Sequence, residues 1–138
     1  MAEPEIIEEW LKRADEDFEF ASSNLQDRNQ FFGQICFHFH QAAEKYLKAF
    51  IIAHDLEFEK IHDLLKLLKT IQKKEPSLAC LREACEFLNP FYVETVRDFK
   101  KKPKKPLHFV SITVSQKISR HWPSNLSNSC PYPHNSPV

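Results

Sequence analysis

Glycine is almost absent from this 138-residue chain, in which Gly33 is the only one. A β-rich fold needs many tight turns, and those turns usually need glycine. A glycine-rich phosphate-binding loop is excluded for the same reason. No stretch is long and apolar enough to span a membrane, and the N-terminus is acidic where a secretory signal is basic. These absences favour a helical, cytoplasmic protein.

The chain contains cysteines, but their spacing matches no recognised cysteine motif. The four cysteines stand at positions 36, 80, 85 and 130, and no two form a C-x-x-C motif. This spacing supports neither a disulfide framework nor a metal site, and it fits a reducing, cytosolic setting. We therefore expect buried free thiols, since free cysteine packs as a small hydrophobe. Metal ligation is the less favoured alternative, and we expect no metal and no cofactor.

The charge of the chain divides it into two parts. Residues 1–95 contain 18 acidic and 11 basic residues, a net charge of −7, whereas residues 96–138 contain 1 acidic and 8 basic residues, a net charge of +7. Seven of the nine prolines lie beyond residue 89. We interpret 1–95 as a helical domain and 96–138 as a basic, Pro/Ser/Asn-rich and largely irregular tail. Residues 110–118 alternate as a short strand would.

Apolar residues recur every three or four positions in four segments, which predicts helices over 4–27, 31–54, 62–74 and 77–89. Asn89 precedes a proline and should end the last helix, with 91–93 extended or in a turn. The fold class is therefore an all-α antiparallel bundle. The apolar positions are Ile7, Leu11, Ala14, Phe18, Ala21 and Leu25; Ile35, Phe39, Ala42, Tyr46, Phe50 and Ala53; Leu64, Leu65, Leu67, Leu68 and Ile71; and Leu78, Leu81, Cys85 and Leu88.

Two histidines of the second helix have the residue type of metal ligands but the wrong spacing. His38 and His40 are two residues apart, so they point about 200° away from each other and do not share one metal. His40 and Glu44 do share a face, but they are only half of an H-E-x-x-H motif. We interpret them as a polar pair on the helix surface or at a dimer seam.

Two acidic residues have a structural and a chemical interpretation. Asp63 suits the N-cap or the first turn of the third helix better than a catalytic role. Asp17 lies at the edge of an apolar stripe, where a carboxylate needs a partner. A lysine or histidine of the second helix would provide that partner, and a binding-site acid is the alternative. The basic run 100–105 is more typical of a solvated linker than of a nucleic-acid contact.

Four pieces of the sequence, in this order, resemble the HEPN domain over roughly residues 5–95. The longest is CFHFHQAAEKYLKA at 36–49 in the second helix. The others are W-x3-A-x2-DF-x2-A at 10–21, His-Asp-Leu at 62–64 and Tyr-Val-Glu-Thr at 92–95.

The resemblance implies an up-and-down bundle of four to five helices, often a homodimer. Many prokaryotic members are encoded beside a minimal nucleotidyltransferase and bind it, in a toxin–antitoxin-like setting. Members of the family are either ribonucleases or non-catalytic proteins that bind a nucleotide or a partner. The ribonucleases carry Arg-x(4–6)-His, whose side chains stabilise and protonate at the scissile phosphate.

That ribonuclease motif is missing from this sequence. Ten residues separate Arg97 from His108, and Arg120 is followed directly by His121. The chain also departs from its relatives after Thr95, which we interpret as an altered or shortened C-terminus. We therefore assign no catalytic residue. A metal-independent ribonuclease with a rearranged Arg/His pair remains the alternative.

The favoured hypothesis is a non-catalytic HEPN protein that binds a nucleotide, a partner nucleotidyltransferase, or both. Its binding surface is expected on the polar side of the first two helices. The candidate residues are Asp17, His40, Gln41, Glu44, Lys45, Lys48 and Arg97.

Overall fold

The computed structural model describes residues 3–27 and 31–92, and all regular structure in these residues is helical. The elements in chain order are α1 (Pro4–Asp27), α2 (Phe32–Ala53), α3 (Leu64–Lys74), the 3-10 helix η1 (Pro76–Leu81), α4 (Arg82–Leu88) and the 3-10 helix η2 (Asn89–Tyr92). The expected all-α class is confirmed. The predicted strand, the basic run and the tail lie outside the described residues, and the boundary at residue 95 stays a prediction.

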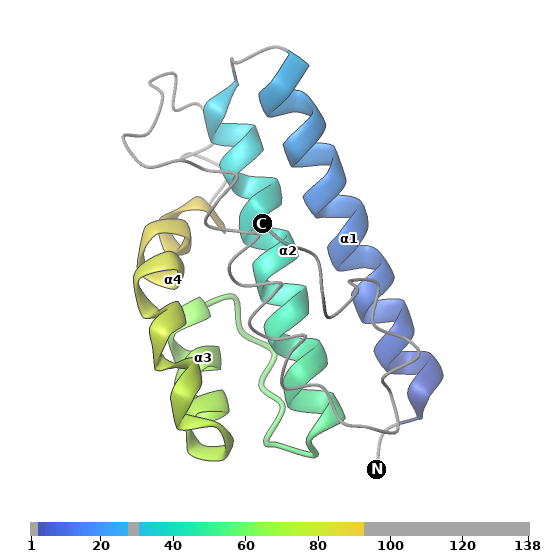
Figure 1. Cartoon of the computed structure of the whole chain (residues 1–138), viewed down its shortest axis with the longest axis vertical. Helices are drawn as coiled ribbons and strands as arrows, with labels where there is room; N and C mark the ends of the chain where they lie inside the picture. The colour runs from blue at the N-terminus through green and yellow to red at the C-terminus, as the bar shows by residue number, and fades with distance from the viewer. Residues whose placement is uncertain (1–2, 28–30, 93–138) are drawn as a thin grey trace.

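Helix α2 is the centre of the bundle. It is antiparallel to α1 on one side, while α3 and α4 lie on the other side (Figure 1). Burial agrees, because 16 of its 22 residues are buried. None of the described helices holds a segment with the length and hydropathy that crossing a bilayer requires.

The core consists of the apolar stripes that the sequence predicts. Within the described residues, every predicted position of α2, η1 and α4 is buried, and those of α1 and α3 are buried or packed against the core. Tyr46, Phe39 and Phe50 of α2 are the largest of the fully buried side chains. Burial of each such ring contributes roughly 1.5–3 kcal/mol relative to its exposure. The periodicity of one central helix therefore organises the whole core.

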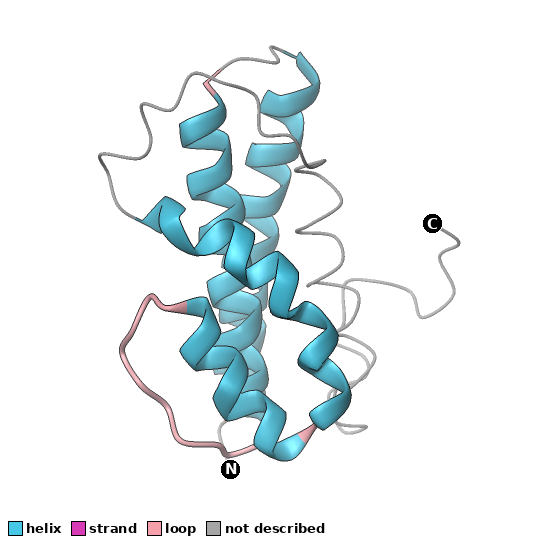
Figure 2. Ribbon diagram, turned by 90° about the vertical axis from the view of Figure 1, so that its left-hand side faces the viewer, coloured by secondary structure: helices cyan, strands magenta, loops and turns pink. Residues whose placement is uncertain are grey.

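The segment between α2 and α3 carries the chain back along α2. Helix α2 ends in a Schellman arrangement, in which the amides of Leu56 and Asp55 donate to the carbonyls of Ile51 (2.9 Å) and Ile52 (3.3 Å). Asp55 adopts a left-handed φ of 52° there, a conformation that Asp tolerates better than most residues. Residues 54–63 then run beside α2 before α3 begins (Figure 2).

Asp63 caps α3, as the sequence predicts. Its carboxylate accepts from the amides of Leu65 (3.0 Å) and Lys66 (3.3 Å). Asn89 completes the cap, because its side-chain NH₂ donates to Asp63 (3.2 Å) and its oxygen accepts from the amide of Leu64 (2.9 Å). This exchange joins the start of α3 to the start of η2.

The predicted fourth helix is divided, and its end differs from the prediction. Residues 76–81 are 3-10 helix, α4 covers 82–88, and a further 3-10 turn follows through Tyr92. Pro90 lies in the first turn of η2, where its missing N–H breaks no hydrogen bond. The extended or turn conformation predicted for 91–93 is therefore wrong at Phe91 and Tyr92, and Val93 lies outside the described residues.

Three cysteines fall in the described part of the chain, and all three are free thiols. Cys36 and Cys85 are buried as expected, and this burial raises the pKa of both thiols to about 12. Cys80 is exposed, so the prediction of a buried thiol is wrong there. It lies on the outer side of η1, between exposed Ala79 and buried Leu81.

Candidate functional site

The Glu44 carboxylate is the centre of a buried polar cluster on α2. Oε1 of Glu44 accepts from Nζ of Lys48 at 2.6 Å and from Nδ1 of His62 at 3.0 Å. The side chains of Glu44 and Lys48 are only 6% and 7% exposed. His62 reaches the carboxylate from the 54–63 segment, although its own side chain is 62% exposed. That segment thus covers the carboxylate from outside.

His40 lies behind Glu44 and is fully buried. Its Nε2–H donates to the backbone carbonyl of His62 at 3.1 Å, which fixes the tautomer of the neutral ring. Burial lowers the pKa of His40 to about 4 from its usual 6.5, although the nearby Glu44 charge and the hydrogen bond to His62 oppose that shift. Nδ1 is left without a hydrogen-bond partner among the described residues, 3.8 Å from Oε2 of Glu44.

These contacts correct one prediction and confirm another. His40 and Glu44 do share a face of α2, but that face is buried, so they are not a pair on the helix surface. The 54–63 segment lies against it. His38 and His40 do point apart, because His38 pairs with Asp17 of α1 while His40 bonds to His62. Within residues 3–27 and 31–92, no three His, Cys, Asp or Glu side chains group as a metal site.

Two aromatic rings lie beside the Lys48 ammonium. Nζ of Lys48 lies 5.9 Å from the ring centroids of Trp10 and Phe58, and the two rings meet edge to face at 6.0 Å. Tyr92 of η2 stacks on His62 with a centroid distance of 6.1 Å. The cluster therefore joins α1, α2, the 54–63 segment and η2.

Asp17 joins α1 to α2 with the partners that the sequence predicts. His38 donates to its carboxylate from 3.3 Å, and the ammonium of Lys45 pairs with the other oxygen. Partial burial alone would raise the pKa of Asp17, but the hydrogen bonds from His38 and Lys45 and the Lys45 charge outweigh it and lower the pKa below 3.8. Two residues before Asp17 on α1, Asp15 accepts a hydrogen bond from the Tyr46 hydroxyl of α2.

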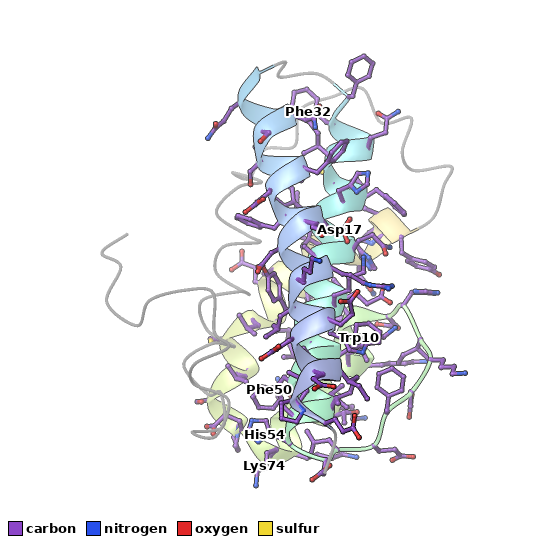
Figure 3. All side chains as sticks on the ribbon, turned by 90° about the vertical axis from the view of Figure 1, so that its right-hand side faces the viewer. Trp10, Asp17, Phe32, Phe50, His54 and Lys74 are labelled. Carbon is purple, nitrogen blue, oxygen red and sulfur yellow. The ribbon has the colours of Figure 1, made fainter. Side chains whose placement is uncertain are left out.

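A pocket of about 550 Å³ opens between α1 and α2 beside this cluster. Trp10 and Asp17 both lie on α1, about two turns apart along the helix (Figure 3). The pocket is lined by Glu5, Ile6, Glu9, Trp10 and Arg13 of α1 and by Glu44, Lys45 and Lys48 of α2. Its volume lies within the range of about 300–1,000 Å³ that small-molecule sites occupy.

The charges of the lining residues balance. Among the described lining residues, three carboxylates face three cations, and each cation has a carboxylate partner. Arg13 pairs with Glu9 at 3.0 Å and Lys48 pairs with Glu44. Lys45 pairs with Asp17, which is not itself among the lining residues. The part-buried and buried pairs hold the ammonium groups of Lys45 and Lys48 in defined positions, whereas the Arg13–Glu9 pair is exposed.

The structure separates the seven candidate residues into groups. Glu44, Lys45 and Lys48 line the pocket, while Asp17 and His40 support it from behind. Gln41 is half-buried and is not among the lining residues. Arg97 lies outside the described residues.

Sequence reasoning missed the aromatic part of the site. Trp10 and Tyr92 entered only as residues of the family resemblance, without a role in a site, and Phe58 was not singled out. The available signal was the position of Trp10, one residue before Leu11 of the apolar stripe of α1. This position lies at the edge of the buried helix face rather than at its centre. The contact of Phe58 depends on the path of the 54–63 segment, which periodicity does not predict.

The family model of the HEPN domain matches residues 7–104, well over half of the chain. The chain belongs to the HEPN family. Its HEPN match contains every described residue of the Glu44 cluster. No curated protein and no solved structure matches the chain significantly.

Removal of Glu44 should destabilise the HEPN bundle strongly. Glu44→Ala leaves the Lys48 ammonium buried without its counter-charge, which costs about 3–5 kcal/mol of unfolding free energy. The double variant Glu44→Leu/Lys48→Met removes both charges and should lose much less. Urea unfolding followed by circular dichroism measures both.

The matched control is the exposed i,i+4 pair of α1. Glu9→Ala breaks the ion pair with Arg13, whose side chains are 55% and 63% exposed, and exposed pairs contribute only about 0–1 kcal/mol. Equal losses for Glu44→Ala and Glu9→Ala would contradict the buried-pair account.

The buried ring of His40 should make stability depend on pH. Its pKa is about 4 in the folded state against 6.5 unfolded, so between these values the unfolded chain binds more protons. The stability contributed by the neutral ring is complete above 6.5 and is lost as the pH falls towards 4. His40→Gln keeps an N–H donor but does not titrate. Its unfolding free energy should fall less across this window than that of the unaltered chain, and parallel profiles would contradict the assignment.

Proposed function

We propose that this chain is a non-catalytic HEPN domain that binds a nucleotide in the pocket between α1 and α2. The observation that carries the proposal is the juxtaposition in the lining of the Trp10 ring with the ammonium groups of Lys45 and Lys48. An aromatic ring beside two ammonium groups suits a ligand that is flat at one end and anionic at the other.

The base of the nucleotide would lie against the apolar part of the pocket. Trp10 provides an aromatic surface there, and Ile6 extends it along α1. Stacking of a base on an aromatic ring contributes about 1–3 kcal/mol and tolerates every base. The proposal therefore includes no preference for one base.

The phosphate would bind at the two lysines of α2. An ammonium group has three N–H donors, and the described residues give each of these lysines one carboxylate partner, Asp17 or Glu44. Donors therefore remain for a phosphate oxygen. Because the carboxylates of the lining already balance its cations, a nucleoside monophosphate suits the pocket better than a triphosphate.

Two observations support a binding role over catalysis. The Arg-x(4–6)-His motif is absent from the sequence, and no histidine of the described residues lines the pocket. A general acid must lie within hydrogen-bond reach of the proton acceptor. His40 has its Nε2 engaged by the His62 carbonyl and is fully buried.

The remaining parts of the proposal rest on the family resemblance, except that the location rests on the cysteine pattern and the acidic N-terminus. They are a cytoplasmic location, a homodimer, and a minimal nucleotidyltransferase as partner in a toxin–antitoxin-like setting. Co-purification of that partner from cells that express both genes tests this part separately from nucleotide binding.

Isothermal titration calorimetry with adenosine and uridine 5′-monophosphates tests the pocket. Trp10→Ala should weaken both ligands by roughly tenfold or more, the equivalent of one lost stacking contact. Lys45→Gln should also weaken both, because it removes a phosphate donor. Lys12→Gln is the matched control, since Lys12 is exposed on α1 and is not among the lining residues.

Two outcomes would contradict the proposal. One is the absence of binding by the unaltered chain, or binding that Trp10→Ala and Lys45→Gln leave unchanged while circular dichroism shows both variants folded. The other is RNA cleavage by the purified protein that Arg97→Ala abolishes, since that result would establish the ribonuclease alternative.

A further inference from the structure

A second concavity lies on the opposite side of α2 from α1, between α3 and the η1–α4 region. Its volume is about 400 Å³, and Leu65, Lys66, Leu68, Lys69, Gln72 and Arg82 line it. Helices α3 and α4 lie next to each other on this side of the molecule (Figure 2). We call it the α3–α4 groove.

The charge of the α3–α4 groove is opposite to that of the domain around it. Residues 1–95 carry a net charge of −7, yet within the described part of the chain the charged groups that line the groove are the cations Lys66, Lys69 and Arg82. The pocket between α1 and α2 differs, because its cations are matched by carboxylates. The α3–α4 groove therefore attracts anions locally, although the domain as a whole repels them.

The cations of the groove are available to a ligand. Within residues 3–27 and 31–92, the ammonium groups of Lys66 and Lys69 form no ion pair, and Arg82 pairs only through its Nε with Glu86 at 3.0 Å. The Arg82 and Glu86 side chains are 73% and 52% exposed, so that pair is weak. The terminal nitrogens of Arg82 keep donors of the geometry that phosphate oxygens accept.

The helical spacing directs the two lysines to the same place. Lys66 and Lys69 are three residues apart on α3, so they are neighbours on one side of the helix, separated by about 4.5 Å along its axis. The opposite side of α3 is buried through Leu64, Leu67 and Ile71. Arg82 adds a third cation from the start of α4. Three cations from two helices thus surround one concavity.

We propose that the α3–α4 groove binds the phosphate backbone of a nucleic-acid strand. A protein partner is less suitable, because protein interfaces are built around aromatic and apolar anchors. Among the described residues, the apolar lining consists of the part-buried Leu65 and the buried Leu68. Reading of bases would require aromatic platforms or convergent polar groups. With one amide, Gln72, beside three cations, the groove binds the backbone without sequence preference.

This inference is independent of the nucleotide proposal, since the two sites share no lining residue. Failure of mononucleotide binding would not affect the proposal that the α3–α4 groove binds a strand. Failure of strand binding would likewise leave the pocket between α1 and α2 untouched.

The test measures binding of a fluorescein-labelled oligouridylate to the full chain by anisotropy over a range of salt concentrations. Each phosphate contact with a single strand contributes about −0.7 to the slope of log K against log salt. Lys66→Gln/Lys69→Gln should therefore flatten the slope by about 1.4. An oligocytidylate should give the same slopes as the oligouridylate.

The matched control removes two lysines elsewhere. Lys12→Gln/Lys60→Gln takes away the same charge from exposed positions that are not among the lining residues of the groove. The basic run at 100–105 is common to all these chains, so it cannot produce a difference between the two double variants. The control should keep the slope of the unaltered chain, and circular dichroism establishes that both variants fold.

Three results would overturn the proposal. The first is no binding of the strand by the unaltered chain. The second is an equal effect of the two double variants on the slope, which would show that strand binding depends on the general surface charge and not on the groove. The third is an unchanged strand affinity of Lys66→Gln/Lys69→Gln together with loss of self-association in sedimentation velocity, which would assign the groove to an acidic face of a second copy.

Discussion

The ion pair between Glu44 and Lys48 is the interaction on which the rest of the structure depends. Two charges buried on a central helix are costly unless each meets the other with good geometry, and here they are 2.6 Å apart. The carboxylate also accepts from His62, which holds the 54–63 segment against α2. The ammonium lies over Trp10 and so connects the pair to α1. The Glu44 carboxylate therefore contacts the 54–63 segment through His62 and positions Lys48 at the pocket between α1 and α2.

The two sides of α2 then have different chemistry. On the α1 side, carboxylates fix the lysines in place, and the net charge of the lining is balanced, which suits a small ligand with one anionic group. On the α3 side, the charged lining consists of Lys66, Lys69 and Arg82, which suits an extended polyanion. The two proposals thus assign two separate anion sites to a domain with a net negative charge, and among the described lining residues Trp10 gives an aromatic ring to the pocket between α1 and α2 alone.

Much of the fold follows from the sequence, because burial imposes a helical period that the order of the apolar residues along the chain reveals. The limits of α1, the core stripes and the Asp63 cap all depend on residues near one another in the chain. The pairing of Asp17 was predictable for a similar reason, since a carboxylate at the edge of an apolar stripe needs a partner.

The burial of His40 and Glu44 was not predictable in this way. It depends on the path of the 54–63 segment, which is non-local and aperiodic. The contacts of Phe58 and Tyr92 were missed for the same reason, and the exposure of Cys80 follows from a 3-10 turn that changes the helical period from 3.6 to about 3 residues. The central claim is a neutral, buried His40 whose Nε2–H bonds to the covering segment. Two-dimensional ¹H–¹⁵N NMR of the histidine rings at neutral pH tests it directly. The account predicts a His40 ring protonated at Nε2 and bare at Nδ1, and a ring protonated at Nδ1, or at both nitrogens, would contradict it.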